Sequence, residues 1–433
     1  MQIRSIGAAC SAFVLSLVLV GCAGPTPNEH GLWGVDEAGV MSLVDKLCAD
    51  EMEGRGAGTA GIELARDLLV LRLQAAGLKP GFVIDGEPSY TQPFELRIGT
   101  DAEGEPVRAT VENVGAILPG VGVLKDQVVV VGGHYDHIGY GEVGSRARDQ
   151  RGEIHPGADD NASGAAAVVL LAKHFERAAR MGSDTIRPRR TIFFTCFAGE
   201  ERGLLGSRYM VRHPEQFAFD ADEISGMVNM DMIGRLRNDE LYVFADDTGQ
   251  QWRDWITQAN EPVGLDLKWD VRPPGGSDHS LFIAASVPAV FFNTWLHEDY
   301  HTPRDTADKL NVPGSVEVIR LVAGLVRRIA TEPERLTFVP PKPRPPRPYL
   351  GVMLGDKRLE GGVLLGSLAP DGPMEQGGAK PGDVLLSIDG RAMNSAGDIR
   401  GFLAKAKAGT KVTIAVRRGD ETVELKIVLG VRR

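Results

Sequence analysis

Several of the histidines and acidic residues in this chain come directly after short apolar segments. His134 closes the run Val129-Val130-Val131-Gly132-Gly133, and Asp136 follows two residues later, where it can orient the His134 ring. The next acids, Asp159 and Asp160, stand in a turn before an apolar helix, which one of them could instead cap. Imidazole and carboxylate groups together are typical zinc ligands. A metal site is therefore one interpretation of these residues, and helix capping is the other.

The same arrangement recurs further along the chain. Glu200 and Glu201 follow an apolar segment at 191–197, Asp231 follows another at 224–230, and His301 lies in the loop after a third. Adjacent carboxylates repel one another unless a cation or solvent compensates their charge. A surface acidic cluster is the alternative, but it would not account for the two histidines, His134 and His301. Five such positions favour a metal site.

These positions require a scaffold that brings strand ends together. Apolar segments at 127–133, 191–197, 224–230, 241–244 and 289–293 are predicted strands, and 162–175 and 315–329 are predicted helices. Amphipathic patterns at 35–47 and 61–76 predict two earlier helices. This alternation predicts an α/β fold with a mixed, largely parallel sheet sandwiched by helices. Ligands bind such sheets at the carboxyl ends of the strands.

The first residues have the features of an export signal. Arg4 precedes an apolar stretch at 6–20, which is shorter than the roughly 20 residues of a membrane span. The sequence Leu19-Val20-Gly21-Cys22 resembles a bacterial lipobox, so we expect a lipoprotein signal peptide at 1–22, lipidation of Cys22 and a flexible tether at 23–34. An ordinary cleaved signal is the alternative. The expected location is the cell envelope, lipid-anchored to a membrane, and Ala23 in place of Asp favours the outer membrane.

Composition limits the possible partners. The chain has 433 residues, a formal net charge of −10 and a pI near 5.5. Because polyanions bind basic surfaces, this charge argues against nucleic acid as a partner. Two thiols, Cys48 and Cys196, would remain beside a lipidated Cys22, and the sequence does not say whether they pair.

A proline-rich stretch divides the chain. Residues 340–348 read Pro-Pro-Lys-Pro-Arg-Pro-Pro-Arg-Pro, which favours an extended linker at 339–348 between a domain at 35–338 and a second one at 349–433. The last segment resembles a bacterial PDZ domain through Gly362-Val363-Leu364-Leu365 and Lys380-Pro381-Gly382-Asp383. The resemblance implies a β-rich module whose peptide-binding loop is formed by Tyr349, Leu350, Gly351 and Val352, with a helix at 395–407 beside the groove. A structural cap without a ligand is the alternative.

The larger domain resembles the co-catalytic zinc aminopeptidases of clan MH, which include bacterial leucyl aminopeptidases and relatives of glutamate carboxypeptidase. The resemblance covers about residues 52–310. It is carried by motifs in the family's order, namely Met52-Glu53-Gly54-Arg55, His134-Tyr135-Asp136, Gly157-Ala158-Asp159-Asp160-Asn161, Gly199-Glu200-Glu201-Arg202-Gly203, Asn229-Met230-Asp231, Ser277-Asp278-His279 and Tyr300-His301-Thr302.

This resemblance implies two Zn²⁺ per chain. Asp160 would bridge the ions, His134 and Asp231 would complete one site, and Glu201 and His301 the other. Glu200 would be the general base. The resemblance also implies that Ser277, Asp278, His279 and Tyr300 lie around the substrate pocket, and we assign His137 and His155 to loops rather than to the ligand set.

The expected function is a zinc-dependent aminopeptidase that removes the N-terminal residue from peptides with a free N-terminus. Two alternatives remain open. One is different chemistry on the same scaffold, as in a carboxypeptidase or a glutaminyl cyclase, and the other is a non-catalytic peptide-binding envelope protein. A serine protease finds no support, because no Gly-x-Ser-x-Gly element occurs.

Overall fold

The computed structural model describes residues 32–100, 105–182, 188–269, 271, 276–341, 347–359, 361–369 and 372–432. The expected signal peptide, Cys22 and nearly all of the tether lie outside these ranges. The chain divides into two compact units, Met1–Pro341 and Lys342–Arg433. Within the described ranges, none of the helices has the length and hydrophobicity that crossing a bilayer requires.

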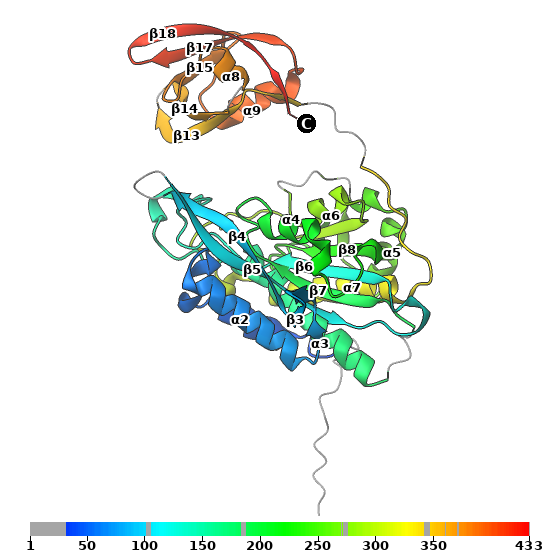
Figure 1. The fold of residues 1–433 in the computed structure, drawn as a ribbon. Coiled ribbons are helices and arrows are strands. Elements are labelled where there is room, and N and C mark those ends of the chain that lie inside the picture. Colours follow the sequence, from blue (N-terminus) through cyan, green and yellow to red (C-terminus); the bar gives the residue numbers. More distant parts are fainter. Residues whose placement is uncertain are drawn as a thin grey trace, which may run out of the picture. The chain divides into compact units, whose positions relative to one another are not determined.

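The first unit is built around one mixed sheet (Figure 1). In the described residues it has nine strands in the order β1-β5-β7-β6-β8-β11-β9-β10, with β4 paired to β5. Four central strands, β7, β6, β8 and β11, run parallel, and β5 and β9 flank them antiparallel. The bounds are β1 (Lys79–Pro80), β4 (Thr91–Thr100), β5 (Pro106–Leu118), β6 (Val128–His134), β7 (Thr191–Phe197), β8 (Ile224–Met230), β9 (Glu240–Phe244), β10 (Asp266–Lys268) and β11 (Ala289–Asn293).

Helices cover both faces of this sheet. Successive side chains of a strand point to opposite faces, so Val129 and Val131 enter one core while Val128 and Val130 enter another. The first core includes side chains of the helices α1, α2, α3 and α7, and the second includes side chains of α4 and α6. The helices are α1 (Glu37–Leu47), α2 (Ala60–Ala75), α3 (Gly164–Arg180), α4 (Leu205–Arg212), α5 (Trp252–Asn260), α6 (His279–Ala284) and α7 (Val312–Thr331). This architecture confirms the predicted α/β class.

Two long strands were not predicted. Strands β4 and β5 pair antiparallel along most of their length and extend the sheet on its β7 side. In β4 the buried residues Gln92, Phe94 and Leu96 alternate with more exposed ones. The alternation of apolar and polar residues that indicates a strand is weak in β4, because one of its buried residues is a glutamine. The amide of Gln92 donates to Gln216, and its oxygen accepts a hydrogen bond from Asn113.

The second unit is rich in strands and has its own apolar core. Its larger sheet has the order β13-β14-β15-β17-β18, with β16 on β15, and β12 pairs with β19. The predicted peptide-binding loop begins where β12 ends at Tyr349, passes through Gly351 with φ 73°, and enters β13 at Val352. The bounds are β12 (Arg347–Tyr349), β13 (Val352–Leu359), β14 (Gly362–Leu368), α8 (Pro373–Gln376), β15 (Val384–Ile388), β16 (Arg391–Ala392), α9 (Ala396–Lys405), β17 (Lys411–Arg418), β18 (Glu421–Val428) and β19 (Gly430–Arg432).

Candidate metal centre

Two groups of side chains converge at the carboxyl ends of the central strands. One group is His134, Asp160 and Asp231, and the other is His137, Asp160, Glu201 and His301. Within each group the potential ligand atoms all lie within 4.8 Å of one another. The structure therefore brings together all five residues assigned as ligands from the sequence, and it adds His137.

Asp160 belongs to both groups through different oxygens. Its Oδ1 lies 3.3 Å from Nε2 of His134, and its Oδ2 lies 3.1 Å from Nε2 of His301. The neighbouring Asp159 takes another role, because its Oδ1 accepts the N–H of Gly234 at 2.6 Å. The geometry places the carboxylate of Asp160, rather than that of Asp159, between the two groups.

The two histidines are oriented by backbone carbonyls. Nδ1 of His134 lies 3.1 Å from the carbonyl oxygen of Asp136, and Nδ1 of His301 lies 3.0 Å from that of Gly144. In each ring Nε2 faces the carboxylates. Nε2 of His301 is buried and makes no hydrogen bond, although Oδ2 of Asp160 and Oε1 of Glu201 lie only 3.1 Å away. A nitrogen and two oxygens that face one another without a hydrogen bond fit a shared cation.

The carboxylate of Asp136 acts mainly on the glutamate turn. Its two oxygens accept the backbone N–H groups of Glu200 at 3.1 Å and Glu201 at 3.3 Å, whereas Nδ1 of His134 lies 3.7 Å from it. Asp136 thus positions the two glutamates at the end of β7, while its backbone carbonyl, and not its side chain, makes the shorter contact with His134.

The excess of carboxylates changes the protonation of the site. Burial lowers the pKa of His301, but the nearby carboxylates of Asp160 and Glu201 outweigh it and raise the pKa to about 11. Burial raises the pKa of Glu200 well above its ordinary value, His134 opposes this, and Glu201 and Asp231 add to it. Such a site favours a cation, and a carboxyl with a raised pKa suits proton transfer near neutral pH.

A buried arginine joins two of the loops that carry ligands. Arg55, from the Met52-Glu53-Gly54-Arg55 motif, donates to the carbonyls of Tyr135 at 2.7 Å and Gly157 at 2.8 Å. The first follows His134, and the second precedes Asp160. Gly157 itself has φ 57°, and a Cβ there would lie 2.5 Å from the His137 ring. Only glycine fits this position without displacing His137.

Asn161 ties the Asp160 turn to the strand that ends at Asp231. Its side-chain amide donates to the carbonyl of Met230 at 3.0 Å, and its oxygen accepts the N–H of Met232 at 3.1 Å. Both partners flank Asp231, so this one side chain fixes the distance between two carboxylates of the first group.

The Ser277-Asp278-His279 segment, which the resemblance places around the substrate pocket, does not line the small cavity beside Asp231. All three residues are buried, and Ser277 accepts a hydrogen bond from Asn229 at 2.8 Å. Burial lowers the pKa of His279 to about 3, so this ring is neutral where it stacks on Phe291. Tyr300 instead lines a small cavity.

That cavity, of about 90 Å³, opens beside Asp231. Its apolar lining includes Met232, Phe291 and Leu296, and Arg146 and Tyr300 also border it. The Arg146 guanidinium lies 4.6 Å from the Tyr300 ring centroid, and that ring stacks on His301. A small apolar cavity beside the candidate ligands can receive a side chain of a substrate.

Sequence reasoning missed three polar residues. His137 was assigned to a loop, but its Nδ1 lies 2.9 Å from Oε1 of Glu201. The carboxylate of Asp305 contacts the backbone N–H groups of Asp159 and Asp160, and His297 lies 3.2 Å from Asp159. The second His of His134-Tyr135-Asp136-His137 was the available signal for the first. His155 lies apart from the ligands, 2.9 Å from Ser145.

Two parts of the chain are similar to known protein families. The model of peptidase family M28 matches residues 113–326, and that of the PDZ domain matches residues 348–429. A probable zinc metalloprotease of Pyricularia oryzae is 33% identical over 213 residues, which are 48% of this chain and 37% of that protein. Aminopeptidase YwaD of Bacillus subtilis is 27% identical over 304 residues, which are 66% of this chain and 60% of that protein. The matched region thus spans less than two thirds of either relative.

Solved structures share the fold. A zinc aminopeptidase from Bacillus subtilis superposes with a TM-score of 0.53 at 18% identity, covering 69% of this chain and 96% of that one. The glutaminyl cyclase of Fimbriiglobus ruber gives 0.53 at 17% identity, covering 68% and 96%. At these identities the likeness concerns the fold alone. The chain is thus similar to peptidase family M28 over residues 113–326, and its C-terminal unit is similar to the PDZ domain over residues 348–429.

Proposed function

We propose that this protein is a two-zinc aminopeptidase that removes the N-terminal residue from peptides. The observation that carries the proposal is the position of Asp160, whose two oxygens face two separate groups of candidate ligands. Two neighbouring sets of nitrogen and oxygen donors that share one carboxylate suit a pair of zinc ions.

The residues divide into two sets of ligands. His134, Asp160 and Asp231 would hold one zinc ion, and Asp160, Glu201 and His301 would hold the other, with His137 beside Glu201. Zinc in such a site acts as a Lewis acid, which lowers the pKa of water and stabilises the developing oxyanion.

Glu200 is the proton carrier in this proposal. Its neighbour Glu201 is a ligand, and Asp136 fixes the backbone of both. The raised pKa of Glu200 allows its carboxylate to accept a proton from the attacking water and to deliver it to the leaving amine.

The cavity beside Asp231 accounts for cleavage at the chain end. A substrate's free α-amine would lie among the carboxylates around Asp231, and the first side chain would enter the cavity of about 90 Å³. Arg146, at its border, makes no ion pair with any described residue, and its cation would favour an acidic group of the substrate.

Glutaminyl cyclase chemistry is the second candidate, because a cyclase shares the fold. The second ligand group, which contains Glu201 and His301, favours the two-zinc peptidase. The relatives named as aminopeptidases support it as well.

Two features outside the site complete the proposal. Lipidation of Cys22 would hold the enzyme at the surface of a membrane in the cell envelope, and the PDZ domain would recruit peptide or protein chains. Removal of residues 349–433 should then reduce hydrolysis of polypeptides more than hydrolysis of small aminoacyl substrates. An equal effect on both would contradict recruitment.

The direct test combines metal analysis with a substrate panel. The purified chain should contain two zinc ions and release nitroaniline from aminoacyl nitroanilides, but not from their N-acetylated forms. Acylation removes the free amine while leaving the scissile bond intact. A chelator should abolish turnover, and zinc should restore it. Cyclisation of N-terminal glutamine without hydrolysis, or full activity in metal-free protein, would refute the proposal.

A further inference from the structure

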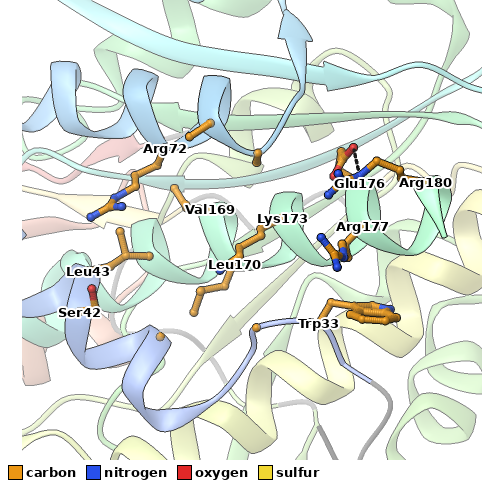
Figure 2. A pocket seen from close by; sticks show the side chains of 14 residues that line it. Trp33, Ser42, Leu43, Arg72, Val169, Leu170, Lys173, Glu176, Arg177 and Arg180 are labelled. Atoms are coloured by element: carbon orange, nitrogen blue, oxygen red, sulfur yellow. Dashed lines mark ion pairs between the residues drawn. The ribbon is translucent and has the colours of Figure 1, made fainter. Parts of the chain in front are cut away.

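A second and larger cavity lies among the helices on one face of the sheet (Figure 2). It has a volume of about 370 Å³ and is bordered by Trp33 and Gly34, by α1, by the last turn of α2 and by α3 from Val169 onward. We call it the helical cavity. Its size lies within the range of small-molecule sites.

Positive charge predominates around the helical cavity. Arg72, Lys173, Arg177 and Arg180 border it, and Glu176 is the one acid among its lining residues. Glu176 already pairs with Arg180 at 3.3 Å. The chain as a whole carries a net charge of −10, so this local excess of cations runs against the protein's overall charge.

Two of these cations have no anionic partner in the described part of the chain. Arg72 makes no ion pair there, and its Nε is buried without a hydrogen bond. Lys173 makes none either, and its ammonium group lies against Gly34, where a Cβ would be 3.0 Å away. Figure 2 shows the two side chains coming from different helices, α2 and α3, at the same cavity. A guanidinium and an ammonium group beside one cavity are suited to a phosphate.

Most of the remaining surface of the helical cavity is apolar. Leu43, Val169 and Leu170 border it, and the Arg177 guanidinium lies over the Trp33 ring, 5.3 Å from the ring centroid. A free inorganic anion would not use this apolar surface. A phosphate ester with a hydrocarbon part would use both the cations and the apolar residues.

The helical cavity is separate from the candidate metal centre. Helix α3 starts at Gly164, next to the turn that holds Asp160, and Lys173 lies nine residues further on. At about 1.5 Å per residue this is roughly 13 Å along the helix, directed away from the strand ends. None of the candidate ligands lines the helical cavity.

One border of the helical cavity lies close in sequence to the expected lipidation site, and this indicates the source of the phosphate. Trp33 is only eleven residues after Cys22, the expected lipidation site, which limits their separation to roughly 35–40 Å. A lipid anchor would therefore hold the helical cavity within reach of the membrane surface. We infer that the helical cavity binds the phosphate of an anionic phospholipid through Arg72 and Lys173, and so orients the enzyme on its membrane.

The test uses the polypeptide from Ala23 onward, which lacks the anchoring cysteine and retains every described residue. Sedimentation with vesicles of phosphatidylcholine containing phosphatidylglycerol should carry the protein down, and vesicles of phosphatidylcholine alone should not. Each of Arg72→Gln and Lys173→Gln should weaken this binding about fivefold, the usual effect of one basic residue near an anionic surface. Arg212→Gln, an exposed control of the same charge change in α4, should bind as the wild type does.

Each result decides the inference. Equal binding by wild type and by the Arg72→Gln/Lys173→Gln double variant would overturn it, and so would an equal loss in Arg212→Gln. Calorimetry with soluble glycerol 3-phosphate separates the sources: binding that depends on Arg72 and Lys173 without vesicle binding would overturn the lipid assignment. Nitroanilide hydrolysis serves as the folding control, because neither variant touches the metal centre.

Discussion

The carboxylate of Asp305 accepts a hydrogen bond from the backbone N–H of Asp160 at 3.1 Å, across 145 residues of sequence. The same oxygen accepts the N–H of Asp159 at 3.0 Å, and the other oxygen lies 3.3 Å from Arg235. Asp305 is fully buried. It therefore fixes the turn from which Asp160 reaches both groups of candidate ligands, and it belongs to neither group.

Asp305→Ala should consequently weaken zinc binding about 10- to 100-fold, the usual effect of removing a group that orients a metal ligand. Asp305→Asn should lose less zinc affinity than Asp305→Ala, because its amide oxygen still accepts a backbone N–H. Competition with a chelating dye measures both affinities, and circular dichroism checks the fold. Asp308→Ala, an exposed acid three residues away, is the matched control. Unchanged affinity in Asp305→Ala would show that the turn does not need this carboxylate.

Glu200→Gln should separate proton transfer from metal binding. The amide cannot accept the proton of water, so kcat should fall by about two orders of magnitude or more. Zinc content should stay at two per chain, because Glu200 belongs to neither ligand group. Glu201→Gln is the informative comparison, since it should lose zinc as well as activity. Near-normal turnover of Glu200→Gln on a leucyl nitroanilide would exclude Glu200 as the base.

The strands that carry the candidate ligands were predictable because they are continuous apolar runs. The predicted bounds of the strands that end before Glu200 and Asp231 coincide with β7 and β8, and both strands are buried along their whole length. His134 emerges from β6 for the same reason. A sheet buried on both faces leaves this signature, and its parallel strands must end at one edge.

Loop residues were harder to place. His137 and Asp305 follow no periodic pattern, and their positions depend on contacts between distant segments. The backbone N–H of His137 donates to the carbonyl of Arg55, and its ring packs against Gly157. Such contacts arise only when the tertiary fold is formed, so a reading of local pattern cannot assign them.

Arg146 should influence which N-terminal residues are cleaved. Its guanidinium borders the cavity beside Asp231, so Arg146→Gln should reduce kcat/KM for a glutamyl nitroanilide relative to the isosteric glutaminyl one. Because the variant would lose a partly exposed ion pair with the substrate, we expect this kcat/KM ratio to change about two- to fivefold. Arg146→Lys should retain part of the preference, and Arg212→Gln should retain all of it. The same ratio in Arg146→Gln and wild type would show that the cation does not contact the substrate.

The PDZ domain contains an ion pair whose contribution should depend on pH. Arg418 donates to the Asp383 carboxylate from Nε at 2.8 Å and from an Nη at 2.7 Å, and this hydrogen bonding lowers the pKa of Asp383. An acid with a lowered folded-state pKa contributes stability above its unfolded pKa of about 3.9 and loses it as the pH falls through the folded value. Asp383→Asn should therefore destabilise the domain at pH 7 by about 1–3 kcal/mol, as expected for a buried, charged hydrogen-bond partner.

This difference should narrow below about pH 4, because the wild-type carboxylate then takes up a proton and weakens its bonds to Arg418. Hydrogen-exchange protection factors of β15 and β17, measured in the full chain at several pH values, report the stability of this domain alone. Asp420→Asn, in the turn between β17 and β18, changes the same charge, and Asp420 forms no ion pair with Arg418 in the described part of this domain, so the variant should leave protection unchanged. A destabilisation of Asp383→Asn that stays constant from pH 7 to pH 3 would mean that Asp383 stabilises the domain by its shape rather than by its charge.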